Sequence, residues 1–188
     1  RAFYEFGFQI QKIQITTPSM QKLILIRHAK TEPYAETGTD ESRKLTERGH
    51  EDAQAISIQL KSMGLTPDYV LVSTARRTRE TFAEIQKVFG QLPHAFSDVL
   101  YLAEPEEIAS CLEGIPDQAC VAVVGHNPGI HDLALRLTEF GGFRNSGAAQ
   151  QLRVKFPTAS VAVFTAKEDD PFNVYNFELS EFFNPKSL

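Results

Sequence analysis

Apolar residues recur along this chain in patterns that predict alternating strands and helices. The β-rich run over residues 22–27, which is bounded by polar residues, predicts a buried strand, and residues 68–73 predict a second one. Between them, Thr46 can cap a helix whose apolar positions recur at helical spacing and which ends near Gly64. A further helix follows the second strand and ends at Gly90; its inward face is formed by Thr78, Phe82, Ile85 and Phe89.

The middle of the chain repeats this alternation. A weaker strand is expected over residues 96–100, and Pro105 stands where the next helix would begin. Residues 119–124 are apolar throughout, as expected for a strand at the centre of a sheet that is covered on both faces. Asn127 and Pro128 then predict the N-cap and the first residue of another helix.

The C-terminal part of the chain is richer in strand patterns. Apolar and polar residues alternate over residues 152–156 and 175–179, and residues 161–164 form an apolar run. Strand and helix alternate for about 120 residues before this β-rich part, which predicts an α/β fold. We expect a three-layer α/β/α architecture with a mostly parallel central sheet and a partly antiparallel C-terminal portion.

Residues 1–19 differ from the rest of the chain. Phe6, Phe8 and Ile10 alternate with glycine and polar residues, which is typical of an extra edge strand, and an N-terminal extension is the alternative. No short apolar core is followed by a small-residue cleavage site, so a signal peptide is not expected. The length of 188 residues suits one core, and we expect a single domain over residues 20–188.

Composition and charge narrow the classes of function. The formal net charge of −5 argues against a protein that binds nucleic acid by neutralising many phosphates. The longest aliphatic runs fall far short of the roughly 20 residues of a membrane span. Two cysteines, Cys111 and Cys120, cannot form a disulfide framework. These features predict a cytoplasmic protein that binds neither nucleic acid nor membrane.

Three predicted strands lead into side chains that can bind phosphate. The first ends at Arg27 and His28, the second leads into an arginine-rich segment that contains Arg77, and the third leads to His126. Ligands of open α/β sheets bind beyond the carboxyl ends of the strands. We therefore expect these four side chains to meet at one edge of the sheet.

Two imidazoles and two guanidinium groups have a coherent chemical use. An unprotonated imidazole is a nucleophile that can carry a phosphoryl group covalently. Guanidinium groups bind phosphate oxygens bidentately and keep their charge at any working pH. A second imidazole can donate a hydrogen bond to the charge that develops on the transferred group. The set predicts phosphoryl transfer through a phosphohistidine intermediate, with no metal or other cofactor required.

Three sequence blocks resemble those of a known family. Arg27-His28-Ala29 resembles the Arg-His-Gly motif of the histidine phosphatase superfamily, also called phosphoglycerate mutase-like. Residues 73–81 resemble its second block, and the sequence Gly-His-Asn-Pro at residues 125–128 matches its third. With residues 40–46 and 156–159 included, the sequence of these blocks is most similar to that of SixA-type phosphohistidine phosphatases. The resemblance covers roughly residues 22–165.

The resemblance implies a role for each of the four residues. His28 would be the nucleophile, Arg27 and Arg77 would hold the phosphoryl oxygens, and His126 would complete the phosphate-binding pocket. The fold implied is phosphoglycerate mutase-like.

The second block departs from the family's pattern. Thr74 stands in place of the usual Pro, and Thr78 in place of the usual Ala. Both changes concern the entry to the helix more than its charge. The resemblance selects Arg77 by its spacing within the block, whereas helical periodicity alone does not choose among Arg76, Arg77 and Arg79.

A general acid is harder to place. Many members of the superfamily protonate the leaving alkoxide from a carboxylate, and Glu104, Glu106 and Glu107 surround Pro105. Acidic residues also suit the first turn of a helix because they interact favourably with the helix dipole. Glu104 is therefore only a candidate acid. SixA-type members resemble this chain in lacking an obvious one, and the imidazole of a phosphoramidate leaves more readily than an alkoxide.

The distance in sequence between Arg77 and His126 bears on the substrate. Two predicted helices and two predicted strands occupy this stretch, which leaves no segment for a lid. An open pocket can admit a phosphohistidine displayed on another protein. We expect a phosphatase that acts on a phosphohistidine-bearing signalling or phosphotransfer protein. The alternatives are a small-molecule phosphomonoesterase that uses the same site and a non-catalytic module that binds phosphate or phosphohistidine.

Overall fold

The computed structural model describes residues 20–188 except residues 37, 116–118, 168–172 and 174. In the described part, six strands form one sheet in the order β3-β2-β4-β1-β5-β6. The strands are β1 (Lys22–Arg27), β2 (Tyr69–Ser73), β3 (His94–Ser97), β4 (Cys120–Gly125), β5 (Val161–Ala166) and β6 (Phe177–Phe183). The edge strand expected within residues 1–19 lies outside the described residues.

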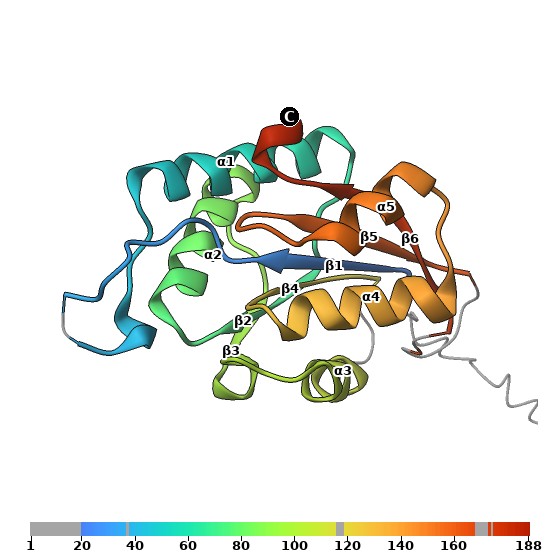
Figure 1. The fold of residues 1–188 in the computed structure, drawn as a ribbon, viewed down its shortest axis with the longest axis horizontal. Coiled ribbons are helices and arrows are strands. Elements are labelled where there is room, and N and C mark those ends of the chain that lie inside the picture. The colour runs from blue at the N-terminus through green and yellow to red at the C-terminus, as the bar shows by residue number, and fades with distance from the viewer. Residues whose placement is uncertain (1–19, 37, 116–118, 168–172, 174) are drawn as a thin grey trace, which may run out of the picture.

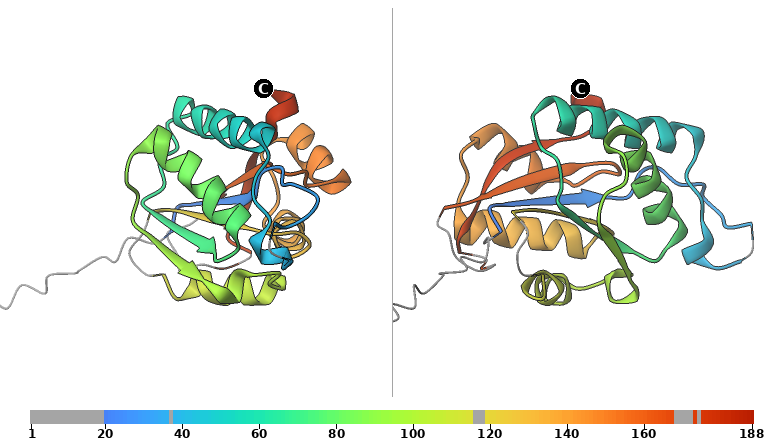
Figure 2. Two further views of the ribbon diagram at one scale, coloured as in Figure 1. Left: turned by 90° about the vertical axis from the view of Figure 1, so that its left-hand side faces the viewer. Right: turned by 180° about the vertical axis from the view of Figure 1, so that it is seen from behind.

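The sheet is mixed in the way that the sequence predicts. Strands β3, β2, β4 and β1 run parallel to one another. Strand β5 pairs antiparallel with β1, and β6 pairs antiparallel with β5. The parallel strands therefore present their carboxyl ends at one edge, on the left in Figure 1 and toward the viewer in Figure 2 (left).

Helices cover both faces of the sheet (Figures 1 and 2). They are α1 (Glu47–Ser62), α2 (Arg76–Phe89), α3 (Pro105–Glu113), α4 (Gly129–Gly141) and α5 (Ser146–Val154). Helices α1 and α2 pack on one face, and α3, α4 and α5 pack on the other. This arrangement confirms the three-layer α/β/α fold. None of the helices in the described residues is both long and apolar enough to cross a lipid bilayer.

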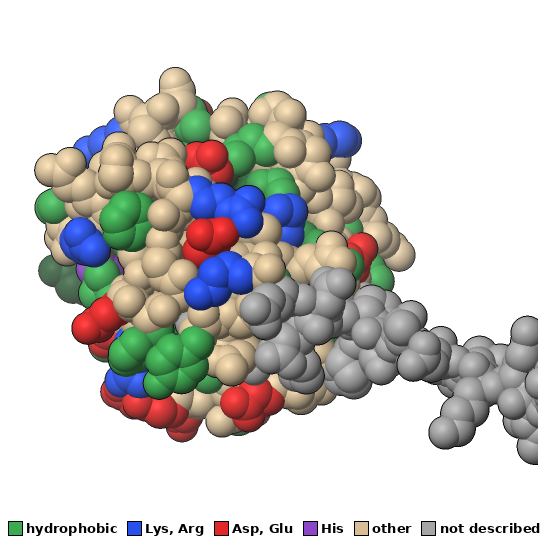
Figure 3. Space-filling model, turned by 90° about the vertical axis from the view of Figure 1, so that its right-hand side faces the viewer, with side chains coloured by type: hydrophobic (Ala, Val, Ile, Leu, Met, Phe, Trp, Pro, Cys, Tyr) green, Lys and Arg blue, Asp and Glu red, His purple; other side chains and the backbone are tan. Residues whose placement is uncertain are grey.

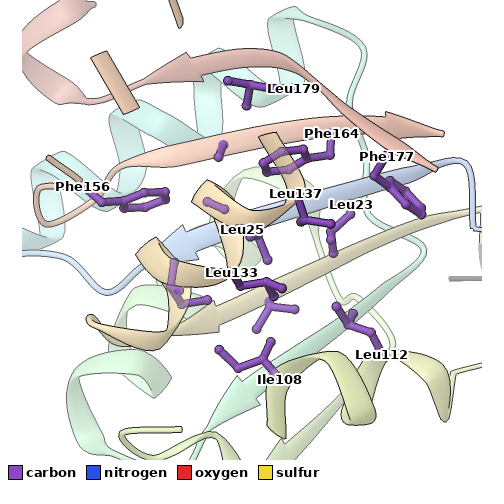
Figure 4. Close-up of a cluster of buried hydrophobic side chains, with 14 of the residues drawn as sticks. Leu23, Leu25, Ile108, Leu112, Leu133, Leu137, Phe156, Phe164, Phe177 and Leu179 are labelled. Atoms are coloured by element: carbon purple, nitrogen blue, oxygen red, sulfur yellow. The ribbon is translucent and has the colours of Figure 1, made fainter. Parts of the chain in front are cut away.

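The four central residues of β1, Leu23–Ile26, are all apolar because both faces of the strand are covered. Successive side chains of a strand point to opposite faces, so Ile24 contributes to the core beneath α1 and α2, whereas Leu23 and Leu25 contribute to the other core. Figure 4 shows Leu23 and Leu25 close to Leu133 and Leu137 of α4. Burying each such side chain contributes roughly 1.5–3 kcal/mol, so both cores hold β1 in place.

The alternation at residues 152–156 was misinterpreted as a strand. These residues lie at the end of α5 and just beyond it, and Asn145 caps this helix by accepting a hydrogen bond from the Ala148 amide at 3.1 Å. Leu152 and Phe156 are buried, whereas Val154 is 73% exposed. The buried residues within α5 are Ala148, Ala149 and Leu152, which have helical spacing, whereas Phe156 lies beyond the helix after the extended Lys155. The exposed apolar Val154 produced the apparent alternation.

Two smaller predictions are also wrong. The strand expected over residues 96–100 is β3 at His94–Ser97, followed by a 3-10 helix at Asp98–Leu100. Asn127 does not cap α4, which begins at Gly129 after a cis Asn127–Pro128 peptide bond. The Asn127 amide instead donates to the carbonyl of Phe156 at 3.0 Å, which links the start of α4 to the segment that follows α5.

Candidate active site

The four side chains predicted from the sequence converge at the carboxyl edge of the sheet. His28 follows β1 and His126 follows β4, and these two strands are in register with Arg27 opposite Gly125. The centroids of the two imidazole rings lie 5.3 Å apart. Helix α2 starts beyond the end of β2 and brings Arg77 to the same place, where its Nε donates to Nδ1 of His126 at 3.3 Å.

His28 is buried and neutral. Its Nδ1 lies 2.8 Å from the carbonyl of Ala29, and because a carbonyl only accepts, Nδ1 carries the proton and Nε2 has a free lone pair. The pKa of His28 is lowered to about 4, chiefly by burial; the hydrogen bond to Ala29 raises it, and the charges of Arg77, Arg27 and Arg43 lower it. At neutral pH the Nε2 atom is a nucleophile that needs no base to deprotonate it.

His126 is held from both sides. Its Nδ1 accepts from Arg77, so the proton lies on Nε2, which donates to the Ser73 hydroxyl at 2.8 Å. Burial, followed by the charge of Arg77, lowers the pKa of His126 to about 3. The ring is therefore neutral, and a phosphoryl group would contact it only by taking over one of these two hydrogen bonds.

Arg77 is the most deeply placed cation of the site, with only 2% of its surface exposed. Its Nη1 donates to the Asp40 carbonyl at 2.7 Å, and its Nη2 donates to Oδ2 of Asp40 at 2.9 Å. The Tyr101 hydroxyl donates to the same Oδ2 at 2.9 Å, and the guanidinium carbon lies 5.7 Å from the centre of the Tyr101 ring. A guanidinium has five N–H groups, so after three hydrogen bonds to protein two remain for an anion.

Two further arginines act on His28. Arg27 donates from Nη1 to the Phe156 carbonyl at 2.9 Å, while its buried Nε has no partner among the described residues. Burial and then the charge of Arg77 lower the pKa of Arg27. Arg43 donates from Nε to Oδ1 of Asp40 at 2.8 Å. Three guanidinium groups against one carboxylate leave a net positive charge, which suits a phosphoryl dianion.

Sequence reasoning did not assign roles to Asp40, Arg43 or Tyr101. Asp40 and Arg43 lie in the block at residues 40–46 that supported the resemblance, which is the only signal that pointed to them. Tyr101 follows the 3-10 helix after β3 and carries no sequence signal. Only the folded chain brings Asp40 and Tyr101 against Arg77, with Arg43 bound to Asp40.

The three glutamates around Pro105 serve α3. Glu106 forms an ion pair with Arg136, and Glu107 accepts from the backbone amide of Glu104 at 2.8 Å. All three side chains are exposed. The carboxylate that contacts the site is that of Asp40. Burial raises its pKa, but Tyr101, Arg77 and Arg43 together hold it below its ordinary value, so Asp40 is ionised at neutral pH. Among the described residues, no three His, Cys, Asp or Glu side chains gather so as to bind a metal ion.

Comparison with known proteins identifies the family. The sequence model of the histidine phosphatase superfamily (branch 1) matches residues 23–100. An uncharacterised protein of Mycobacterium leprae is 32% identical over 142 residues, which span 73% of this chain and 85% of the relative. This chain belongs to the histidine phosphatase superfamily. An uncharacterised chloroplast protein of Arabidopsis thaliana is 30% identical over 162 residues, which span 80% of this histidine phosphatase and 69% of the relative.

Solved structures agree with this assignment. A protein of Agrobacterium tumefaciens described as a candidate phosphohistidine phosphatase SixA superposes with a TM-score of 0.74 at 28% identity, covering 88% of this chain and 99% of that chain. The protein histidine phosphatase SixA in complex with tungstate has a TM-score of 0.70 at 20% identity, covering 88% of this chain and 97% of that chain, and shows the shared fold. The expected superfamily, fold class and SixA-type likeness are confirmed, and they support phosphatase activity.

Proposed function

We propose that this histidine phosphatase removes phosphoryl groups from phosphohistidine on a partner protein, through a phosphohistidine intermediate on His28. The observation that carries the proposal is the buried, neutral His28, whose unprotonated Nε2 lies among three arginine charges. The domain responsible would be residues 20–188. A cytoplasmic location stays a prediction.

The proposed reaction has two displacements at phosphorus. Nε2 of His28 forms a bond to phosphorus while the bond from phosphorus to the substrate imidazole breaks, and the electron pair leaves with that imidazole. Water then attacks the phosphorus on His28 while the bond from phosphorus to Nε2 breaks, and the electron pair returns to the His28 imidazole. The proton of the water passes to solvent or phosphate, and inorganic phosphate leaves. The Nε of Arg27 and the two remaining N–H groups of Arg77 would hold the phosphoryl oxygens, and His126 would keep Arg77 in position.

The surroundings of the site favour phosphohistidine over an ordinary phosphate ester. An alkoxide leaving group needs a proton, but Asp40 is ionised, and the glutamates of α3 are exposed and two of them are engaged at that helix. An imidazole that carries a proton on its other nitrogen leaves as a neutral ring, so it needs no acid in the pocket. Between Arg77 and His126, the described residues form α2, β3, a 3-10 helix, α3 and β4, and none of these elements is an inserted lid domain.

A substrate comparison with a nucleophile variant tests the proposal. Purified protein is assayed, with chelator present, against a histidine-phosphorylated protein domain and against an aryl phosphate. We expect faster turnover of the phosphohistidine domain, no effect of chelator, and radiolabelled phosphate that stays on the protein after an alkaline quench, in which phosphohistidine is stable. His28→Ala should lower kcat by at least about 10³-fold and abolish labelling. His94→Ala, which alters an exposed histidine of β3, is the matched control.

Each alternative function gives a different result. A small-molecule phosphomonoesterase would turn over phosphate esters faster than the phosphohistidine domain and would still lose activity in His28→Ala. A binding module would show no turnover in the unmodified protein, and His28→Ala would keep most of its affinity for phosphate. Either result would contradict the proposal.

A further inference from the structure

A second hollow lies beside the candidate active site. It has a volume of about 950 Å³ and lies between the start of α1, the end of α5 and the C-terminal 3-10 helix (Pro185–Ser187). Figure 2 (left) shows these three elements on one side of the carboxyl edge of the sheet. We call it the basic groove, since its lining includes four basic side chains: Lys30, Arg48, Lys155 and Lys186.

The charge of the basic groove is mostly uncompensated. Arg48 forms ion pairs with Asp52 at 2.8 Å and Glu51 at 3.7 Å, and Asp52 is the single carboxylate that lines the groove. The other three cations, Lys30, Lys155 and Lys186, are exposed, and no carboxylate of the described residues lies within ion-pair distance of their amines. The groove is therefore positive on a chain whose net charge is −5.

The basic groove adjoins the candidate active site around His28. Arg27 in the pocket and Asn127 in the groove both donate to the carbonyl of Phe156, at 2.9 and 3.0 Å, so this peptide forms a wall of both. Lys30 follows His28 by two residues along the chain. A molecule seated in the groove would lie beside the substrate phosphoryl group.

We propose that the basic groove docks an acidic surface of the partner protein that displays the phosphohistidine. This inference rests on the proposed function and adds the chemical character of the partner. Opposite potentials around a site steer the partner toward it and raise the association rate without fixed pairings.

The kind of cation favours a protein surface over a second phosphate subsite. The uncompensated cations are lysines, which act as flexible point charges, whereas bidentate phosphate recognition favours arginine. They also come from three separate segments: the loop after β1, the end of α5 and the C-terminal 3-10 helix. Such a spread of mobile charges matches an extended acidic face better than one small anion.

Three synthetic phosphohistidine peptides test the inference. They have the same length and the same central phosphohistidine, and differ only in flanks of four Asp, four Asn or four Lys residues. For the unmodified protein we expect kcat/KM to be about tenfold higher for the Asp peptide than for the Asn peptide at low salt, and lowest for the Lys peptide. The difference should shrink as salt is added.

A pair of charge reversals assigns the effect to the groove. Lys155→Glu with Lys186→Glu should remove the preference for the Asp peptide, while kcat/KM for an aryl phosphate changes by less than about twofold. Lys30 is left unchanged because it is so close to His28. The matched control is Lys61→Glu with Lys167→Glu, which places the same change of charge at the end of α1 and after β5, toward the amino edge of the parallel strands. The space-filling view of that side shows both charges mixed (Figure 3).

The outcomes separate the two proposals. Equal hydrolysis of the three peptides, or a preference that survives the groove variant, would overturn the docking surface and leave the phosphohistidine activity standing. Hydrolysis of the aryl phosphate but of none of the peptides would overturn the proposed function, and the docking inference with it.

Discussion

The carboxylate of Asp40 is a negative charge close to the proposed position of the substrate phosphoryl group. Its carboxylate accepts from Arg77, Arg43 and Tyr101, and so occupies part of the positive potential around His28. Asp40→Asn keeps the shape of this side chain but removes its charge. We expect inorganic phosphate to inhibit the variant with a Ki about 3–10-fold lower, because one repulsion between like charges is lost. Inhibition of aryl phosphate hydrolysis at constant salt measures it.

A neighbouring carboxylate provides the control. Glu36 is exposed and forms ion pairs with Lys44 and Arg76, outside the cluster around Arg77. Glu36→Gln should leave the Ki for phosphate within about twofold of that of the unmodified protein. An unchanged or weaker affinity in Asp40→Asn would show that the carboxylate acts on the site mainly by positioning Arg77.

The predictability of the site residues depends on how each one reaches the site. His28 and His126 directly follow central strands, so the strand pattern alone places them at one edge. Arg77 was chosen over Arg76 by spacing within a motif, and burial agrees: Arg77 is 2% exposed, whereas the Arg76 side chain is 45% exposed and pairs with Glu80. Asp40 reaches the site through a loop, and the course of a loop is set by contacts that periodicity does not show.

At the scale of elements, the start of α4 is fixed by a close backbone approach. A Cβ on Gly129 would lie 1.9 Å from the carbonyl oxygen of Ala103, two residues after Tyr101. We expect Gly129→Ala to lower the free energy of unfolding by at least about 1–3 kcal/mol. It should also lower kcat, because α4 begins just after His126. Urea unfolding and aryl phosphate turnover measure the two effects.

A glycine elsewhere separates this contact from helix propensity. Gly147 is exposed in α5, and a Cβ there would meet only the side chain of Asn145, at 3.4 Å. Gly147→Ala should therefore preserve stability or raise it by up to about 1 kcal/mol, as expected for Ala in a helix. If Gly129→Ala were equally harmless, the contact between α4 and Ala103 would not be what fixes the start of this helix.

The secondary structure was predicted correctly where the hydrophobic pattern of a segment fits only one type of element. It was predicted wrongly where the pattern fits both a strand and a helix. Strands β1 and β4 are buried on both faces, and their apolar runs leave little choice. The segment around Leu152 alternates like a strand only because the exposed Val154 is apolar; its buried residues within α5 have helical spacing. Asn127 does not cap α4 because its side-chain amide donates to the carbonyl of Phe156, a partner 29 residues away in sequence. Local capping rules do not contain such partners.

At the scale of the whole molecule, the alternation of strands and helices implied a parallel sheet but not its order. The position of β4 between β2 and β1 is a tertiary result, and it decides the site because it sets His126 between His28 and Arg77. This arrangement lowers the free energy of unfolding in mild acid. Two imidazoles are buried among guanidinium groups, and both resist protonation in the folded state.

This resistance predicts that the folded protein is sensitive to mild acid. The pKa of an exposed histidine is 6.5, and folding lowers it to about 4 for His28 and about 3 for His126, first through burial and then, for both, through the charge of Arg77. Between pH 6.5 and pH 4 the unfolded chain therefore binds protons that the folded chain does not. The free energy of unfolding must fall as the pH falls through this range, and each histidine accounts for up to about 2 kcal/mol at pH 5.

Urea unfolding at pH 7 and pH 5 isolates the contribution of the two imidazoles. Carboxylates contribute to acid sensitivity in every variant, so the informative quantity is the difference between the unmodified protein and His28→Gln with His126→Gln. Glutamine does not titrate, and the variant should lose about 2–4 kcal/mol less than the unmodified protein between the two pH values. Equal losses would mean that the two rings accept protons as readily in the folded protein as in the unfolded chain. A charged His28 would then not be available as a nucleophile in mild acid, and the unprotonated Nε2 on which the proposed reaction depends would be lost with it.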